Sequence, residues 1–299
     1  MRWHDRVAHR IPRRLVLAFA HRYIAGPSLD DALRVADDLW ASRRIRSTLD
    51  VLGEQVTSPE QARAALEAYM RAAEGAAARP HVSLSFKPGH FGQLVEPALC
   101  ERQARDLAAR CERPHTRLTI DMEDTDLTDA TLALYRRLRP EFPGLGLVLQ
   151  SRLFRTAEDV ENLAGLDARV RLCIGAYDVS GEMGYGTRYE AKENLLRLLP
   201  RLLDVATVVE IATHDRALVE RIRGVLARRE VARERIEFQM LMGVPRRKLQ
   251  DALVADGWTV RLYVPYAESW DDATAYLRRR LVETPSIAGL ALRNLFGTG

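Results

Sequence analysis

The chain has 299 residues, of which 47% are hydrophobic and 29% charged, a composition typical of a folded globular protein and not of a disordered one. Its 45 Lys and Arg stand against 41 Asp and Glu, a net charge of only +4, and the two signs are interspersed; this argues against a nucleic-acid-binding protein. Three cysteines, Cys100, Cys111 and Cys173, lack the paired spacing of a zinc site or a disulfide framework, and they indicate a reducing cytoplasm.

The N-terminal region, residues 1–46, is predicted to form a helical arm ahead of the first strand. It lacks the apolar core of a signal peptide, and the chain has no apolar run of the roughly 18 residues that a membrane helix needs. Residues 13–24 are basic and amphipathic; a helix packed on the domain is favoured there, and a helix lying on a membrane surface is the alternative. We therefore expect a cytoplasmic protein, with peripheral contact at the inner face of the membrane as the alternative.

Runs rich in apolar and β-branched residues recur along the rest of the chain, with helical periodicity between them. Several runs contain few polar residues, as expected for strands covered on both faces. The predicted strands are 47–52, 82–87, 118–122, 145–150, 170–175, 207–213, 236–241 and 259–264. The clearest helical segments are 101–110, 157–164, 189–203 and 216–229, and helix starts are expected at 57–60 and 126–129. This alternation predicts one α/β domain over 47–299, a (β/α)8 TIM-type barrel, in preference to an open sheet.

The carboxyl ends of the predicted strands carry polar side chains of every kind. In a barrel of this type these ends form one rim, where active sites lie. The residues expected there are Asp50, Lys87, Asp121, Glu123, Gln150, Arg171, Tyr177, Thr213, His214, Gln239 and Tyr263. A barrel with a merely structural role would not need so many polar groups at one rim.

The strongest local pattern is Tyr276-Leu-Arg-Arg-Arg-Leu-Val-Glu283, near the C-terminus. On a helix Tyr276, Arg279, Arg280 and Glu283 share one face. Two adjacent guanidiniums can bind one carboxylate in bidentate fashion, with the tyrosine packed on an apolar substrate body. The alternative is a solvated helix with ordinary ion pairs between successive turns.

Three further segments place chemistry at strand ends. Gly175 and Ala176 let a flat ring approach the backbone between Arg171 and Tyr177, and Lys87 precedes a Pro-Gly turn. The acids that follow the strand at 118–122 could bind a metal, but counter-charges to Lys and Arg are favoured, and no metal site is predicted. The chain contains no Gly-x-Gly-x-x-Gly, P-loop or Gly-x-Ser-x-Gly motif, which argues against a Rossmann dinucleotide site, a phosphoryl transferase and a serine hydrolase.

Taken in order, these motifs resemble the proline dehydrogenase family. The match rests on nine segments between residues 20 and 296, which are Thr48–Glu54, Lys87–Gly92, Ile120–Asp124, Val148–Gln150, Arg171–Tyr177, Ala212–His214, Phe238–Leu241, Arg261–Pro265 and Tyr276–Glu283. The resemblance implies bound FAD and the oxidation of L-proline to Δ1-pyrroline-5-carboxylate by hydride transfer to flavin N5. It also implies an electron acceptor such as a membrane quinone.

The resemblance implies a role for each matching position. Arg279 and Arg280 would hold the substrate carboxylate. The substrate pocket would be lined by Lys87, Asp121, Tyr177, Leu241, Tyr263 and Tyr276. The cofactor would contact Gln150, Arg171, Gly175, Ala176, Thr213, His214, Gln239 and Glu283.

The chain departs from the family pattern at Ile174, where a lysine usually precedes Gly-Ala-Tyr. The stretches 178–182 and 283–286 are also unusual. Because Ile174 is uncharged, a cationic contact that the family pattern places near the flavin is lost. Two alternatives to plain proline oxidation follow. One is oxidation of a substituted or carrier-bound proline, and the other is a non-catalytic barrel retained for binding.

Overall fold

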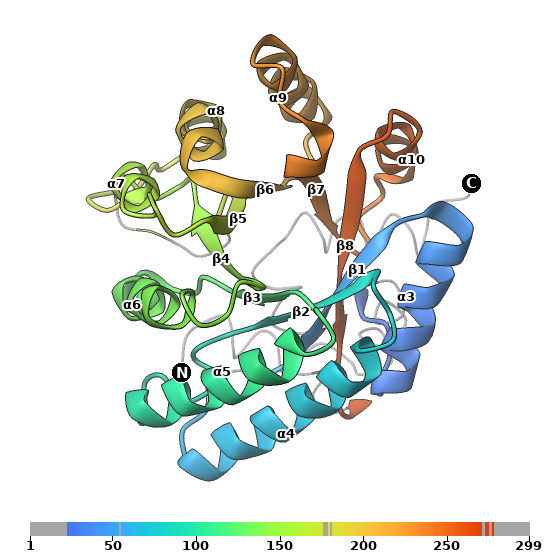
Figure 1. The fold of residues 1–299 in the computed structure, drawn as a ribbon, viewed down its shortest axis with the longest axis vertical. Helices are drawn as coiled ribbons and strands as arrows, with labels where there is room; N and C mark the ends of the chain where they lie inside the picture. The colour runs from blue at the N-terminus through green and yellow to red at the C-terminus, as the bar shows by residue number, and fades with distance from the viewer. Residues whose placement is uncertain are drawn as a thin grey trace.

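The computed structural model describes residues 23–53, 55–175, 179, 181–270, 273, 274 and 277. It shows a closed barrel of parallel strands arranged in chain order, with β1 paired to β8 (Figure 1). The strands are β1 (Arg46–Val51), β2 (Val82–Phe86), β3 (Leu118–Ile120), β4 (Leu145–Gln150), β5 (Ala168–Cys173), β6 (Ala206–Ala212), β7 (Ile236–Leu241) and β8 (Thr259–Tyr266). The predicted (β/α)8 barrel is confirmed, with each strand boundary within a few residues of its expected place.

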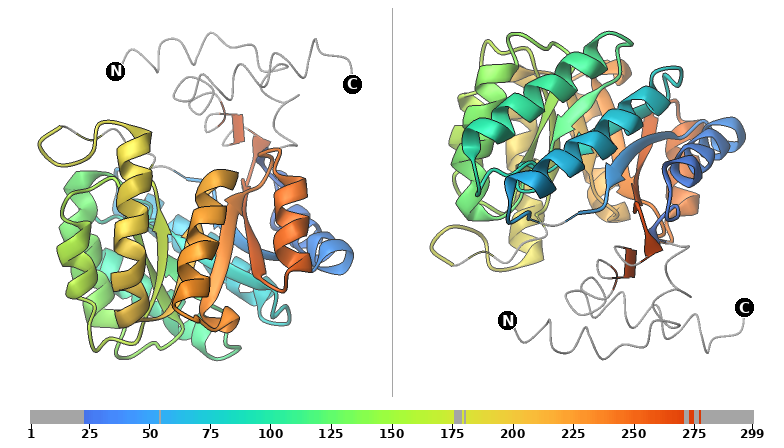
Figure 2. Two further views of the ribbon diagram at one scale, coloured as in Figure 1. Left: turned by 90° about the horizontal axis from the view of Figure 1, so that it is seen from above. Right: turned by 90° about the horizontal axis from the view of Figure 1, so that it is seen from below.

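Helices follow the strands and cover the outside of the barrel (Figure 2). They are α3 (Leu29–Arg43), α4 (Pro59–Ala76), α5 (Pro97–Glu112), α6 (Thr128–Leu138), α7 (Thr156–Glu161), α8 (Arg188–Val205), α9 (Arg216–Arg228) and α10 (Arg247–Ala255). Two short 3-10 turns, η1 (Thr125–Leu127) and η2 (Arg233–Arg235), precede α6 and β7.

Helix α3 is the described part of the predicted N-terminal arm. Its first turn is set by Ser28, whose hydroxyl accepts a hydrogen bond from the backbone N–H of Asp31 at 3.2 Å. The helix buries Ala32 and Leu33 against the barrel beside β1 and β8. The division into an arm, 1–46, and a barrel, 47–299, stays a prediction, although β1 already begins at Arg46.

One helix prediction needs correction. Helix α7 ends at Glu161 and not at residue 164, because the chain turns there through hydrogen-bonded turns up to Leu166. The helix start expected at 126–129 is confirmed, since α6 begins at Thr128 with Asp129 in its first turn, and Asp124 caps the preceding turn η1. At α4 the expectation is confirmed, since Ser58 caps the helix and proline occupies its first turn.

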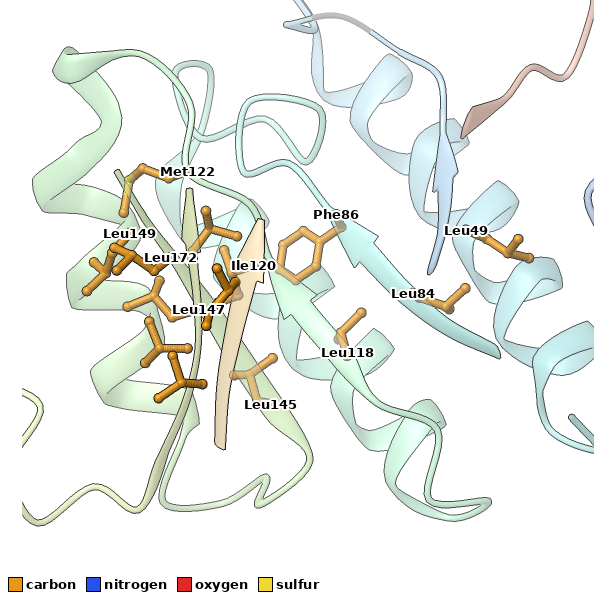
Figure 3. Packing of buried hydrophobic residues seen from close by; sticks show 14 of the residues in the cluster. Leu49, Leu84, Phe86, Leu118, Ile120, Met122, Leu145, Leu147, Leu149 and Leu172 are labelled. Atoms are coloured by element: carbon orange, nitrogen blue, oxygen red, sulfur yellow. The ribbon is translucent and has the colours of Figure 1, made fainter. Parts of the chain in front are cut away.

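Most strands alternate between an apolar and a more polar face. Outward side chains such as Leu84, Phe86, Ile120 and Leu147 pack beneath the helices and form the core (Figure 3). The next residue on each strand points into the barrel, and it is often charged or hydroxylic. The low polarity expected of several runs is seen in β4, whereas β5 carries two arginines on its inward face.

The barrel interior is filled by hydrogen-bonded ion pairs. Arg169 pairs with Glu210, and Arg261 Nε lies 2.5 Å from Glu237 Oε1. The amide of Gln239 donates to both acids, at 2.8 Å to Glu210 and 2.7 Å to Glu237. All five side chains are buried. Because each buried charge faces an opposite charge, the interior avoids the large penalty of an unpaired ion.

A glycine makes room for one of these pairs. A Cβ added at Gly146 would lie 2.7 Å from the Arg169 guanidinium carbon. That guanidinium cannot move freely, since it also donates to Leu118 O at 2.7 Å and to Gly144 O at 3.0 Å.

We predict that Gly146→Ala lowers the free energy of unfolding by about 1–3 kcal/mol, because the methyl group overpacks a fixed buried ion pair. Gly186→Ala is the matched control, since no atom lies within 4 Å of its added Cβ. Denaturant unfolding of both variants measures the difference. Equal stability of the two variants would contradict this account of Gly146.

Candidate active site

Five polar side chains, from the ends of β1, β2, β3, β5 and β8, meet at the carboxyl rim of the barrel. Lys87 Nζ lies 2.5 Å from Asp50 Oδ1, and Arg171 Nη1 donates to Asp121 Oδ1 at 2.8 Å. Tyr263 donates its hydroxyl to the other oxygen of Asp121 at 2.6 Å, while the Arg171 guanidinium lies 5.4 Å from the centre of the Tyr263 ring. We call these residues the rim cluster. Sequence analysis expected all five at this rim, and the structure brings them into direct contact.

Burial governs the protonation of the rim cluster. Burial raises the pKa of Asp50, an effect that Lys87 opposes and that the nearby Asp121 reinforces. Burial and the two carboxylates, Asp121 and Asp50, raise the pKa of Tyr263 well above its usual value, so its hydroxyl remains a proton donor. Burial disfavours the charge of Arg171, but Asp121 and Glu210 outweigh it and raise its pKa.

A third acid, Glu123 after β3, lies next to the rim cluster and contacts the loop after β2. Glu123 accepts a hydrogen bond from the backbone N–H of Gly89 at 2.6 Å, and burial raises its pKa. A Cβ at Gly89 would lie only 2.7 Å from this carboxylate, so glycine permits the contact. His90 packs over Gly53, and burial followed by the charge of Lys87 lowers its pKa to about 4.

The ends of β4 and β5 form a narrow, flat part of the rim. Gln150 is buried and donates its amide to Glu123 O at 2.8 Å. Gly175 follows β5 with a φ of +104°, and a Cβ there would lie 2.8 Å from Gln150 Oε1. Only glycine suits both the backbone and the contact. Gln150 and Arg152 fill the space beside Gly175, and the approach of a flat ring to the backbone there stays a prediction.

The rim continues across β6 and β7. His214 accepts a hydrogen bond on Nε2 from the backbone N–H of Leu241 at 3.3 Å, whereas its buried Nδ1 has no hydrogen-bond partner. Burial and then Arg246 lower the pKa of His214 to about 4. Thr213 is buried and accepts from the backbone N–H of Asp215 at 3.2 Å. Leu241 is 44% exposed, an apolar side chain open at the rim.

One expected site residue lies deeper than the others. The Gln239 amide is held by Glu210 and Glu237 inside the barrel, below the rim. Six expected site residues lie outside the described residues, namely Ala176, Tyr177, Tyr276, Arg279, Arg280 and Glu283. Their roles stay predictions.

Two described residues that closely precede Arg279 and Arg280 in the sequence lie at the rim. Ala273 and Leu277 are buried in one apolar cluster with Leu52, which follows β1, and Ala267, which follows β8. Arg279 and Arg280 follow Leu277 by two and three positions in the sequence.

Sequence analysis assigned no role to three polar residues that support the rim. Glu210 lies 3.8 Å from Arg171 as well as pairing with Arg169, and Ser85 accepts from Arg171 at 3.4 Å. His90 packs between Gly53 and Lys87. The sequence could have indicated Glu210 and Ser85, because a charged or hydroxylic residue recurs at every second position within a strand and such residues point to the same face.

The acids of the rim do not converge as metal ligands do. Asp121 contacts Arg171 and Tyr263, and Glu123 accepts from Gly89. Among the residues that the structure describes, no three His, Cys, Asp or Glu side chains gather as a metal site requires. The acids at this rim instead balance cations and orient hydroxyl and amide groups.

Comparison with known proteins gives consistent matches. A family model described as "Proline dehydrogenase" matches residues 32–182 and 187–290. The protein named proline dehydrogenase of Deinococcus radiodurans is 30% identical over 292 residues, covering 96% of this chain and 93% of its own length. Proline dehydrogenase 2 of Bacillus subtilis is 31% identical over 257 residues, covering 85% and 83%.

Among solved structures, this fold resembles proline utilization A (PutA) from Bdellovibrio bacteriovorus inactivated by N-propargylglycine. The TM-score is 0.82 at 23% sequence identity, over 94% of this chain. This chain spans 34% of the length of that PutA chain. The likeness shows a shared barrel fold.

The two depressed histidines generate a prediction about acid stability. In the folded protein His90 and His214 stay neutral down to about pH 4, whereas in the unfolded chain they take up protons below the ordinary value of 6.5. The unfolded state binds more protons in this window, so stability falls as the pH drops from 6.5 towards 4.

We expect His90→Gln and His214→Gln each to reduce the proton uptake on unfolding near pH 5 by about one proton. The slope of unfolding free energy against pH measures this uptake. His115→Gln, which removes an exposed imidazole, is the control. Slopes that stay unchanged in both rim variants would contradict the depressed pKa values.

Proposed function

Because this chain belongs to the proline dehydrogenase family, we propose that it is an FAD-dependent enzyme that oxidises L-proline to Δ1-pyrroline-5-carboxylate. The observation that carries the proposal is the rim cluster, where two buried carboxylates, two cations and a tyrosine meet at the face on which barrel enzymes place their chemistry. This arrangement is suited to binding a small zwitterion beside a redox group.

The residues of the rim fit a flavin. His214 Nδ1 is buried and has no hydrogen-bond partner among the described residues, so it is available to a polar group of the cofactor. We assign Gln150, Arg171, Gly175, Thr213, His214 and Gln239 to the cofactor, with Ala176 and Glu283 from the family pattern. The flavin, when bound, supplies the acceptor for the hydride that leaves the proline carbon next to nitrogen.

Substrate binding is proposed to depend on positive charges that face the substrate carboxylate. Arg279 and Arg280 are proposed to hold the carboxylate in bidentate fashion. In support, Leu277 is buried at the rim just before them in the sequence. Tyr177 and Tyr276 complete the pocket in this proposal, together with the exposed Leu241.

The rim cluster then orients the reacting part of the substrate. Asp121 fixes the hydroxyl of Tyr263, and Asp50 holds the ammonium of Lys87. These contacts keep both side chains in one position and exclude water from the pocket. Arg171 keeps a buried positive charge at the rim, which would stabilise negative charge that develops on the cofactor.

The electron acceptor is proposed to be a quinone at the inner face of the membrane, reached by peripheral contact from the cytoplasm. Within the described part of the chain, no helix has the length and apolar character to cross a bilayer. The basic, amphipathic segment 13–24 supports a surface contact.

Ile174 favours a second candidate. It replaces a cation usual in the family, and it packs against the barrel core directly before Gly175. A changed flavin environment would suit a substituted or carrier-bound proline. A non-catalytic binding barrel is the third reading, and it predicts a protein that takes up no flavin.

The main test is anaerobic reduction. The purified protein is expected to show the absorbance of oxidised flavin, and L-proline should bleach it. The double variant Arg279→Met/Arg280→Met should keep the flavin and lose bleaching by L-proline, because the carboxylate has lost both guanidiniums. Arg278→Met is the matched control, since on a helix it faces away from that pair. Normal bleaching of the double variant would falsify the assignment of this pair.

A substrate panel separates the candidates. We expect L-proline to reduce the flavin with a higher kcat/KM than 4-hydroxyproline or pipecolate. Ile174→Lys, which restores the family residue, should leave this preference unchanged. Faster reduction by a substituted proline, or no flavin uptake at all, would favour the second or third candidate respectively.

A further inference from the structure

A cavity opens at the end of the barrel opposite to the rim cluster. Its volume is about 300 Å³, and it lies where β1, β2, β3 and β8 begin. The guanidiniums of Arg46, Arg117 and Arg261 line this cavity, together with the side chain of Ser83. Arg117 stands just before β3 and Asp121 just after it. These four residues of extended chain span about 13 Å, so the cavity is separate from the rim cluster.

The strand order brings these arginines together. Arg46 and Arg261 are register partners on neighbouring strands, and their side chains therefore point to the same face. Arg261 is buried and donates to Ser47 O at 2.7 Å and to Ser83 Oγ at 2.8 Å. Its position is fixed by these bonds and by Glu237.

The positive charge here exceeds the negative charge. Among the described residues, Arg46, Arg117, Arg169 and Arg261 face two carboxylates, Glu210 and Glu237, which gives an excess of two positive charges. Arg169 and Arg261 hold these acids directly, while Arg117 lies 3.6 Å from Glu237. Arg46 has no hydrogen bond or ion pair within the described residues; its guanidinium lies 5.9 Å from the centre of the Trp40 ring, and the charges of Arg261 and Glu237 act on it from nearby.

The lowered pKa values agree with this charge count. Burial and then Arg261 lower the pKa of Arg46, and burial and then Arg169 lower that of Arg117. Arg79 also lines the cavity, but it does not add to the excess, since its Nε donates to Asp37 at 3.0 Å.

We propose that this cavity is a binding site for a small dianion of the phosphate class, held by Arg46 and Arg117, with Arg261 as a fixed cation that Ser83 keeps in place. Guanidiniums bind tetrahedral oxyanions through several hydrogen bonds, and a dianion matches the excess of two charges. Occupancy would join β1, β3 and β8 and stabilise the barrel. The proposal does not depend on the proposed oxidation of proline.

The test is calorimetric titration of the full-length, flavin-loaded protein with inorganic phosphate, at fixed ionic strength set by chloride. We expect saturable binding with a dissociation constant of about 1 mM or tighter. Arg46→Gln and Arg117→Gln should each weaken it by about tenfold or more, whereas Arg46→Lys should weaken it less. Arg63→Gln on the outer surface of α4 removes the same charge and should have no effect.

Three outcomes would overturn the site. They are the absence of saturable binding, equal weakening by Arg63→Gln, and competition by L-proline, which would place the anion at the rim. Methyl phosphate tells whether the ligand is a phosphate monoester or free phosphate. A site for monoesters binds methyl phosphate, whereas a site closed around the free ion does not. Far-ultraviolet circular dichroism confirms that each variant is folded, and Arg46→Gln, which breaks no recorded bond, serves if Arg117→Gln does not fold.

Discussion

Charged side chains point into a closed barrel, and each needs a partner because little water can reach it. This constraint organises the molecule. Arg169, Glu210, Glu237 and Arg261 come from four neighbouring strands, and they contact one another only if the strands keep their register. A shift by one residue would place these charges in the apolar layer under the helices, at a cost of several kcal/mol for each ion. The ion pairs therefore specify the arrangement more than they add to its stability.

The same interior layer supports the candidate active site. Arg171 contacts Glu210 below and Asp121 above, so the deeper acids help to hold the rim cluster in place. Asp121 in turn fixes Tyr263, and Asp50 fixes Lys87. A site built on strand ends over a rigid charged layer keeps its donors in position before a ligand arrives, which favours electrostatic stabilisation of a transition state.

The two ends of the barrel differ in their balance of positive and negative charge. At the rim Asp50, Asp121 and Glu123 balance Lys87 and Arg171, whereas at the opposite end the arginines outnumber the acids. A proline-type substrate brings both a carboxylate and an amine to the rim, which suits a mixed set of charges. The opposite end offers mainly guanidiniums around a cavity, which suits an anion alone.

The sequence by itself determined the barrel, its strand order and the rim residues, because a period of two in strands and 3.6 in helices is written in local spacing. The family motifs also pointed to the chemistry without coordinates. Tertiary structure alone decided which polar residues meet. Glu210 and Arg169 are 41 positions apart, and Asp121 and Tyr263 are 142 apart, so no local pattern pairs them. Closure of the sheet also turned one strand face into a polar interior, because eight parallel strands that bury apolar residues under the helices have only the inside left for charges.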